Sequence, residues 1–280
     1  MKVGLAIPNS GPDAVRGVRL LPKVAEDAGF GSVFFIDHVI STAEYDHDFG
    51  TAWVEPLTAL TYASAATRRI GLGVSVLVAP YRDPVYAAKI LSNIDQFSNG
   101  RVILGLGTGY SPIEYAALGR RRLFDERGAV TDEAIDVMKT CWRGGEVNFD
   151  GAYFQFADVR FEPPPVQAGG PRLWIGGQSP RALRRAARVG DGWHPAGLSA
   201  DDVKQLGARL LDLTDRKVEW CPRIFIRDLD AARIGDQIRA YEEIGCTNLV
   251  VSWHELSTDG QRRFIDAVST SIDLDEMSHA

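Results

Sequence analysis

The sequence predicts a (β/α)8 TIM barrel, because short apolar runs alternate with helical segments from one end of the chain to the other. Most of these runs are continuously apolar, as expected for parallel strands that are buried on both faces. Eight such units in 280 residues match the usual size of a closed barrel, about 250 residues. The strands are expected over 2–7, 32–36, 70–78, 101–107, 172–176, 192–195, 223–228 and 248–253.

Signals at the ends of the helical segments support the same alternation. The helix over 83–100 opens with Asp83 as its N-cap and Pro84 in its first turn. An open doubly wound sheet is the alternative fold, but the first strand–helix turn lacks the G-x-G-x-x-G fingerprint of such sheets. Further helices are expected over 16–30, 55–67, 201–214, 228–245 and 259–273, and directly after Ser179.

The segment 110–171 is longer than a barrel connection requires, and it predicts an insertion before the fifth strand. We expect a long helix near 125–144 and then an extended excursion. Residues 273–280 are expected to fray, as chain ends commonly do. Because no repeat, low-complexity stretch or linker divides the chain, we predict a single domain over residues 1–280.

Composition narrows the classes of partner. A net charge of −6 and a pI near 5.4 argue against nucleic-acid or anionic-membrane binding, so any anion site must be local. Three cysteines without a CxxC pair support neither a disulfide framework nor a thiolate zinc site. The N-terminus does not resemble a signal peptide, and no apolar run approaches the roughly 20 residues of a membrane span. We therefore expect a cytoplasmic protein.

The active sites of such barrels lie at the carboxyl ends of the strands, so the residues that follow each strand are the first candidates. Three of the five histidines fall on this rim, together with two tryptophans and two glycine-rich turns. In strand order, the rim residues are Asp37, His38, Ser75, Val76, Thr108, Gly109, Tyr110, Gly176, Gly177, Gln178, Ser179, Trp193, His194, Arg227, Trp253 and His254.

The stretch GGQSP at 176–180 has the chemistry of an anion site. Ser179 predicts an N-cap and Pro180 the first helical residue, so free N–H groups at the helix start point toward an approaching anion. The helix dipole adds about 0.3–1 kcal/mol near the terminus. The alternative is a capped barrel helix without a ligand. The arginines expected on its solvated outer stripe are Arg181, Arg184, Arg185 and Arg188.

The second glycine-rich turn, LGLGTGYSP at 104–112, is a weaker signal. It lacks the final spacing of a dinucleotide fingerprint and the lysine of a P-loop. Close packing at a barrel corner explains its glycines equally well, so the turn by itself does not indicate a ligand.

His38 is the candidate for proton transfer. The segment DHVISTAEYDHD at 37–48 contains two histidines and several carboxylates, but its spacing matches no standard zinc site, so we expect no metal. A histidine titrates near neutrality and contributes about 10²–10⁴-fold when it acts as acid or base beside a reacting atom. His38 and its neighbour Asp37 are therefore the predicted catalytic pair. A histidine that only bonds locally at the strand end is the alternative.

These rim residues and the longer motifs around them resemble the bacterial luciferase-like superfamily, especially its branch that uses the deazaflavin coenzyme F420. The likeness covers nearly the whole chain and agrees with the order of the predicted barrel. Its most specific blocks are 95–110 and 171–195. The matching motifs are DH at 37–38, SVLVAPYRDPVYAAK at 75–89, DQFSNGRVILGLGTGY at 95–110, FADVRFEPPPVQ at 156–167 and PRLWIGGQSPRALRRAARVGDGWHP at 171–195.

The resemblance implies that the cofactor ring lies in the barrel mouth, with its phosphate on the loop after the fifth strand. Members of the branch carry a non-proline cis peptide in a bulge behind the ring, and Ser75–Val76 stands at that place. Asp37 and His38 match the pair that touches the ring and assists proton transfer. The other residues expected to bind the cofactor are Thr108, Gly109, Gly176, Gly177, Gln178 and Ser179.

The chain also departs from the branch. Sugar-phosphate dehydrogenases of this type carry a glutamate directly after the GTG segment, where this chain has Tyr110, and the nearest acid is Glu114. The basic residues expected around a sugar phosphate are not recognisable either. We therefore expect a neutral or apolar substrate. Its predicted contacts are Tyr110, Trp193, His194 and His254.

Together these features predict an oxidoreductase that transfers a hydride between coenzyme F420 and a small organic substrate. The first alternative is an FMN-dependent monooxygenase of the same fold, which receives reduced flavin from a separate reductase. The second is a family member that binds a cofactor or a partner without turnover, since fold does not fix function. The resemblance also implies a homodimer packed through the early helices.

Overall fold

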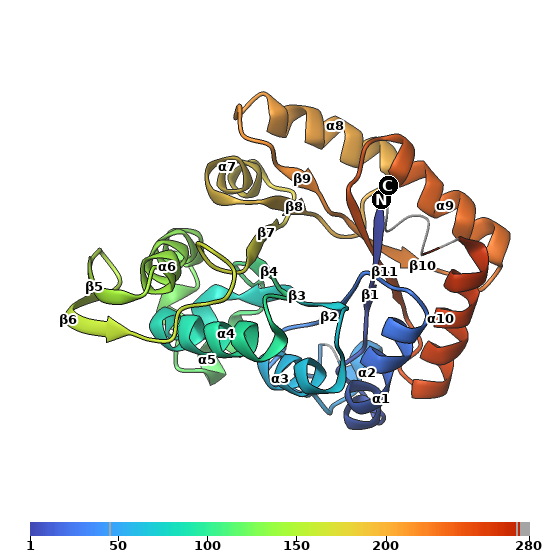
Figure 1. The fold of residues 1–280 in the computed structure, drawn as a ribbon, viewed down its shortest axis with the longest axis horizontal. Coiled ribbons are helices and arrows are strands. Elements are labelled where there is room, and N and C mark those ends of the chain that lie inside the picture. Colours follow the sequence, from blue (N-terminus) through green and yellow to red (C-terminus); the bar gives the residue numbers. More distant parts are fainter. Residues whose placement is uncertain (45, 273, 275–280) are drawn as a thin grey trace.

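The computed structural model describes residues 1–44, 46–272 and 274. In this part of the chain, nine parallel strands form one curled sheet with helices on its outer face (Figure 1). The order of the strands is β10-β11-β1-β2-β3-β4-β7-β8-β9. The prediction of an α/β fold built on a parallel sheet is therefore confirmed. The fraying expected for 273–280 concerns residues that, apart from Leu274, lie outside the described part.

The bounds of the elements are as follows. The strands of the sheet are β1 (Lys2–Ala6), β2 (Ser32–Phe35), β3 (Gly71–Val78), β4 (Val102–Gly107), β7 (Arg172–Gly176), β8 (Gly192–His194), β9 (Glu219–Trp220), β10 (Arg223–Ile226) and β11 (Asn248–Trp253). The α-helices are α1 (Ala14–Asp27), α2 (Asp46–Phe49), α3 (Pro56–Ala66), α4 (Pro84–Ser98), α5 (Pro112–Ala117), α6 (Arg127–Trp142), α7 (Pro180–Val189), α8 (Ala200–Leu211), α9 (Ala231–Glu243) and α10 (Thr258–Ser271).

The two ends of the strand order, β9 and β10, belong to one extended stretch that is interrupted at Pro222. β9 pairs with β8, and β10 pairs with β11. The N–H groups of Cys221 and Arg223 donate to the carbonyls of Trp193 and Pro195, at 2.8 Å each. The sheet thus curls until its ends meet, which is consistent with the predicted barrel. Its seventh strand is split in two.

Between β4 and β7 the chain forms α5, α6 and an antiparallel hairpin of β5 (Gly145–Asp150) and β6 (Gln155–Phe161). The hairpin extends away from the curled sheet (Figure 1). Glu133 on α6 accepts the N–H groups of Ala152, Tyr153 and Phe154 at 2.7–2.9 Å, which ties the hairpin turn to the helix. The sequence predicted α6 near its observed place but described the hairpin only as an extended stretch.

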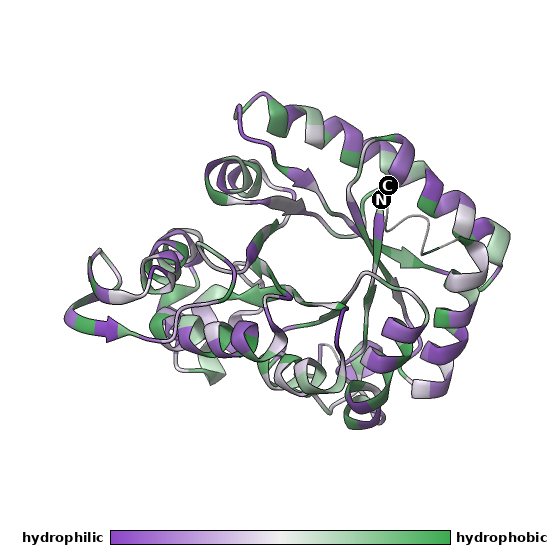
Figure 2. Ribbon diagram, in the orientation of Figure 1, coloured by the Kyte–Doolittle hydropathy of each residue, from purple (hydrophilic) through white to green (hydrophobic). Residues whose placement is uncertain are grey.

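Apolar residues concentrate on the strands and on the inward faces of the helices (Figure 2). In α7 the inner stripe of Leu183, Ala186 and Ala187 is buried, as the helical period predicts. Two N-caps also form as predicted. Asp83 accepts the N–H groups of Val85 and Tyr86, and Ser179 accepts that of Ala182.

The register of β3 against β4 shifts between Val74 and Leu77, and the Ser75–Val76 peptide within this bulge is cis, as expected. The Val76 side chain lies so close to the neighbouring strands that only glycine fits beside it. A Cβ added at Gly107 would lie 2.6 Å from Val76 Cγ2, and one at Gly176 would lie 2.8 Å from Val76 Cγ1. Packing around Val76 therefore explains one glycine in each glycine-rich turn.

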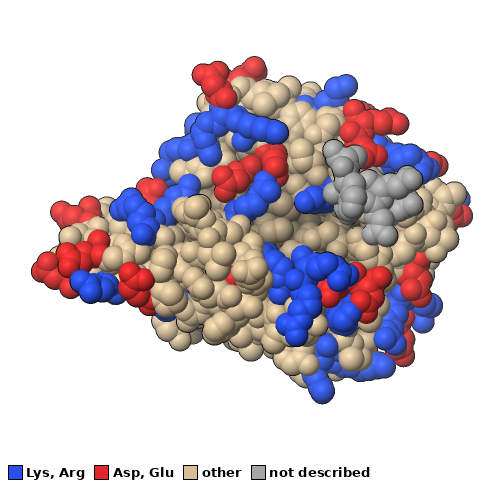
Figure 3. Space-filling view, viewed as in Figure 1, with Lys and Arg blue, Asp and Glu red and all other residues tan. Residues whose placement is uncertain are grey.

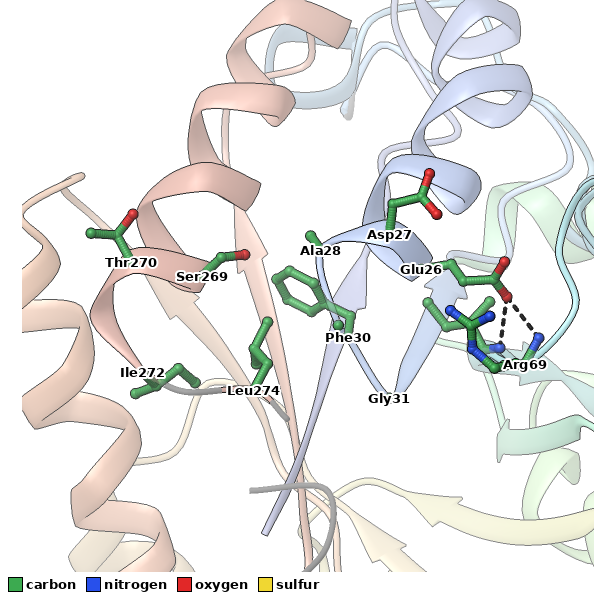
Figure 4. A pocket seen from close by; sticks show the side chains of 12 residues that line it. Glu26, Asp27, Ala28, Phe30, Gly31, Arg69, Ser269, Thr270, Ile272 and Leu274 are labelled. Carbon is green, nitrogen blue, oxygen red and sulfur yellow. Dashed lines mark hydrogen bonds between the residues drawn. The ribbon is translucent and has the colours of Figure 1, made fainter. Parts of the chain in front are cut away.

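A pocket at the opposite, amino-terminal end of the strands is built around Glu26 (Figure 4). One oxygen of this buried carboxylate accepts the N–H groups of Arg68, Arg69 and Ile70 at 2.7–3.0 Å. Burial alone would raise the pKa of Glu26, but these donors hold the pKa below its ordinary value. The carboxylate fixes the turn that leads into β3.

Replacing Glu26 with Gln should lower the free energy of unfolding at pH 7 by about 1.5–3 kcal/mol, because the turn loses charge-assisted hydrogen bonds. The folded-state pKa is lowered, so this stabilisation is complete above the ordinary value of 4.5 and is lost as the pH falls through the folded-state pKa. Urea unfolding of both proteins at pH 7 and pH 4 measures the difference, which should shrink at pH 4. Asp27→Asn, at an exposed neighbouring carboxylate, is the control and should change stability by less than about 0.5 kcal/mol.

Candidate functional site

The end of β2 is positioned by Asn9, which is fully buried. Its side-chain amide donates to the carbonyls of Ile36 and Val54, and its side-chain oxygen accepts the Ile36 N–H at 2.9 Å. These bonds hold the chain directly before Asp37 and His38, so the predicted pair starts from a rigid strand end.

Asp37 faces the protein interior. Its carboxylate accepts two bonds from Arg82, at 2.6 and 2.8 Å, and a third from the Val78 N–H at 2.7 Å. Arg82 also donates to Glu55 at 2.7 Å. Although burial opposes its charge, the two carboxylates raise the pKa of Arg82, which stays a cation. This geometry favours a role for Asp37 in holding the loop after β3 over direct contact with a ligand.

His38 forms a pair with Glu114 rather than with Asp37. The Nδ1 atom of His38 lies 2.9 Å from Glu114 Oε2, and both side chains are buried. The same carboxylate accepts the Tyr81 hydroxyl at 3.1 Å and the Val39 N–H at 3.2 Å. Burial and the charge of Glu114 raise the pKa of Tyr81, so Tyr81 remains a donor. Glu114 is therefore placed to accept the Nδ1–H of His38.

The other ring nitrogen of His38 is turned toward the rim. Tyr110, whose side chain is exposed, places its hydroxyl 3.4 Å from His38 Nε2, and the ring of Trp53 lies 4.7 Å from the imidazole centroid. Because Glu114 fixes the proton on Nδ1, Nε2 is the atom that can accept or release a proton on this side. The predicted substrate contact Tyr110 thus lies beside the predicted acid or base.

Sequence reasoning gave no role to Glu114 beyond noting it as the nearest acid to the GTG segment. It stands at the third position of α5, after the N-cap Ser111, where a helix-capping role would be the ordinary expectation. The distance between His38 and Glu114 along the chain hides their contact, which depends on the packing of α5 against the end of β2.

His194 and Ser75 meet inside the sheet. The Ser75 hydroxyl lies 2.8 Å from His194 Nε2, and the Nδ1 atom bonds to the Cys221 carbonyl. Phe34 and Trp174 pack against the imidazole, which is 2 % exposed. Both ring nitrogens are engaged by the protein, so the structure favours a role for His194 in positioning Ser75 over the predicted substrate contact.

Trp193 is also fully buried, and its indole N–H donates to the Gly177 carbonyl at 2.8 Å. This bond anchors the loop after β7, whose residues Gly177, Gln178 and Ser179 are exposed. Trp193 was predicted to contact the substrate. In the structure it instead anchors the loop that is predicted to bind the phosphate. Gly177 has φ +96°, a conformation that other residues rarely adopt.

The turn after β4 is held in a similar way. Tyr115 donates its hydroxyl to the Thr108 carbonyl at 2.6 Å. Gly109 has φ +69°, and a Cβ there would lie 2.6 Å from Val78 Cγ1. The predicted cofactor residues Thr108 and Gly109 are thus fixed against Tyr115 and the end of β3, and Gly176 at the end of β7 lies against Val76 in the bulge.

The expectation for the arginines of α7 was wrong for Arg185. This residue is 7 % exposed, and it donates twice to Asp132 on α6 and once to the Gly128 carbonyl. Arg188 also pairs with Asp132. Because α6 packs beside α7, the side of the helix predicted to face solvent is partly an interface between helices.

A pocket of about 670 Å³ opens at the same rim, next to the ends of β1, β2, β10 and β11. Trp253 and His254, predicted at the end of the eighth strand, both line it, and their rings lie 4.3 Å apart. His254 is thus placed where the substrate contact was predicted. Within the described residues no group of three or more histidine, cysteine and acidic side chains could hold a metal ion. No helix there is long and apolar enough to cross a membrane.

Comparison with known proteins gives consistent matches. A family model described as luciferase-like monooxygenase matches residues 1–216. An F420-dependent glucose-6-phosphate dehydrogenase of Amycolatopsis mediterranei (strain U-32) is 34% identical over 172 residues, 60% of this chain and 50% of that protein. An FMNH2-dependent dimethylsulfone monooxygenase of Pseudomonas putida is 30% identical over 188 residues, 66% of this chain and 50% of that protein. The alignments thus span about half the length of these two relatives.

The fold also matches solved structures. An F420-dependent secondary alcohol dehydrogenase in complex with an F420–acetone adduct has a TM-score of 0.82 at 18% sequence identity, and the match covers 98% of each chain. At this identity the likeness establishes the shared fold. The relatives with higher identity include both an F420-dependent and an FMNH2-dependent enzyme.

We predict that His194 stays neutral at pH 7 with its proton on Nδ1. Burial lowers the pKa of His194 to about 4, so the imidazole should not titrate between pH 5.5 and 8. Since the unfolded state takes up this proton near pH 6.5, the free energy of unfolding should fall as the pH drops from 6.5 toward 4. Nitrogen-15 NMR of the imidazoles, with His194→Phe to assign the signal, measures this. A His194 signal that titrates near pH 6.5 would contradict the prediction.

Proposed function

The chain belongs to the luciferase-like monooxygenase family, and we propose that it is an oxidoreductase that transfers a hydride between coenzyme F420 and a small organic substrate. The observation that supports it most is the arrangement around Val76. Gly107 and Gly176, at the ends of β4 and β7, border this side chain, and the His38–Glu114 pair lies at the same rim. A cofactor surface and a proton-transfer group are thereby brought to one end of the sheet.

The residues at this rim fit a phosphate-bearing cofactor. The loop Gly177–Ser179 is exposed, and the start of α7 offers N–H groups that the helix itself leaves unpaired. Glycine at 107 and 176 keeps the surface beside Val76 flat, because a Cβ there would meet the valine. We propose that Gly176, Gly177, Gln178 and Ser179 hold the phosphate, and that Ser75, Val76, Thr108 and Gly109 border the ring.

When bound, a deazaflavin supplies the hydride chemistry, and the protein orients the substrate and manages its proton. His38 Nε2 can take up or release the proton of a substrate hydroxyl at the rim, while Glu114 stabilises the imidazolium that forms. Asp37 contributes to this site by holding Arg82 and the loop after β3. His38 is thus the proposed catalytic residue, and Glu114 and Asp37 are positioning residues.

We also propose a homodimer that forms through α3 and α4. Figure 3 shows a large uncharged area over α4. Tyr62 on α3 and Tyr86 and Phe97 on α4 are 45%, 65% and 68% exposed. Because α3 and α4 lie against each other, these exposed apolar side chains fit an interaction surface.

The proposal is tested by fluorescence titration of the purified full chain with F420 and, separately, with FMN. We expect F420 to bind at least about tenfold more tightly than FMN. Tighter binding of FMN would support instead the FMN-dependent monooxygenase, for which the Pseudomonas relative is the precedent. Binding of neither cofactor would contradict both and favour a protein that binds a partner without turnover.

Gln178→Glu tests the phosphate loop. The substitution places a negative charge beside the proposed phosphate and should weaken F420 binding by about tenfold, because the like charges repel. Gly177 is a poorer target, since its positive φ would strain any other residue. The same change at an exposed glutamine on α8, Gln205→Glu, is the matched control and should leave the affinity unchanged. If both variants fold and bind F420 with equal affinity, the phosphate does not bind at this loop.

His38→Ala should lower kcat by about 10²-fold or more and leave the melting temperature within a few degrees, because it removes the acid or base at the rim. Glu114→Gln should lower kcat less. A kcat within twofold of wild type for His38→Ala would exclude the proposed acid or base role.

A further inference from the structure

Arg223 is a cation without a carboxylate partner inside the mouth of the curled sheet. From the start of β10 it reaches across to β3, where Nη1 lies 3.3 Å from the Ser75 carbonyl oxygen, and its Nε donates to the Ser252 hydroxyl on β11 at 3.2 Å. No aspartate or glutamate of the described chain lies within ion-pair distance of it. By contrast, the half-buried Arg82 and the buried Arg185 each pair with an aspartate.

The two contacts of Arg223 leave most of its guanidinium available. Only two of its five N–H donors are used by described residues. Ser252 donates its own proton to the Ile224 carbonyl, so it serves Arg223 as an acceptor. Burial lowers the pKa of Arg223 to about 10, which still leaves the group charged at neutral pH. The side chain is half-buried, and a charge that is partly withdrawn from water is stabilised when an anion binds beside it.

Arg223 lines the pocket of about 670 Å³, whose other walls are largely apolar. They include Phe49, Phe225, Trp253 and Leu256. This volume is typical of sites for small organic ligands. One cation among apolar walls fits a ligand with one anionic group and an apolar body.

The acidic residues of the same pocket are engaged elsewhere. Asp48 is 70% exposed and lies against His47, and Glu255 accepts the backbone N–H of Ser257 at 3.3 Å. Neither pairs with Arg223, so neither compensates its charge.

We propose that Arg223 binds the carboxylate of an organic-acid substrate whose apolar body fills this pocket. The inference rests on the proposed function, because it identifies the ligand of this pocket as the substrate of the proposed oxidoreductase. It replaces the expectation of a neutral substrate, which rested on the lack of recognisable basic residues near the rim. Arg227, the arginine expected at the end of this strand, is exposed and outside the pocket.

The test compares two probes of one carbon skeleton, hexanoate and hexanamide, on the full chain at pH 7 by ligand-observed NMR. Hexanoate should bind at least about tenfold more tightly than hexanamide. Arg223→Gln should reduce this preference to less than about twofold, and Arg223→Lys should retain part of it because the charge remains. Arg227→Gln is the matched control and should keep the full preference.

Equal binding of the two probes by the wild-type protein would overturn the proposal, and so would a preference that survives in Arg223→Gln. F420 affinity is measured by fluorescence on the same proteins. If F420 displaces hexanoate and Arg223→Gln weakens F420 binding by tenfold or more, the anion belongs to the cofactor and the proposal is also overturned. The protein could also prefer hexanoate over hexanamide in a way that depends on Arg223 and yet not bind F420. This result would support the carboxylate site and contradict the proposed function.

Should Arg223→Gln not fold, the wild-type comparison and Arg223→Lys still decide the question. Equal affinity for acid and amide in the wild type would leave Arg223 with a structural task only, to hold the Ser75 carbonyl.

Discussion

The packing of Val76 against the neighbouring strands is the constraint from which the rest of the site follows. The bulge in β3 brings this side chain against β4 and β7, and glycine at 107 and 176 is what the available space allows. Interiors are packed too closely to absorb extra atoms without movement of the backbone. The glycine-rich ends of β4 and β7 are therefore first a consequence of the bulge. The same packing leaves these glycine positions without side chains, and this explains why a ligand can approach the strand ends.

Around this bulge, polar side chains cross from strand to strand and are almost fully engaged within the protein. Ser75 bonds to His194, which bonds to the Cys221 carbonyl, and Asp37 holds Arg82 beside the end of β3. Buried polar groups stabilise a structure when each has its partner, and they fix one arrangement when they are linked. The rim therefore divides into groups that build the site and the few that remain available to a ligand. The loop after β7 and Arg223 are of the second kind.

Much of this could be predicted from the sequence, because it depends on local signals. Continuous apolar runs gave the strands, Asp83 and Ser179 gave helix starts, and the resemblance located the bulge at Ser75–Val76. The features that the sequence did not predict depend on contacts between distant segments. The partner of His38 is Glu114, 76 residues away, and the inward face of Arg185 is set by the packing of α6. Arg223 rather than Arg227 lines the pocket because Arg223 stands at the start of β10, whereas Arg227 lies beyond the end of that strand.

Ser75 joins the two halves of the rim. Its hydroxyl contacts His194 beneath the proposed cofactor surface, and its carbonyl accepts Arg223 at the wall of the pocket. The donors of Arg223 that the protein leaves unused can bind a ligand anion while Nη1 keeps its bond to this carbonyl, because a guanidinium carries five N–H donors. The bulge and the pocket are therefore in contact through one residue. Substitutions at Ser75 alter both halves together, so single-residue variants at Arg223 and at Gln178 separate cofactor binding from substrate binding more cleanly.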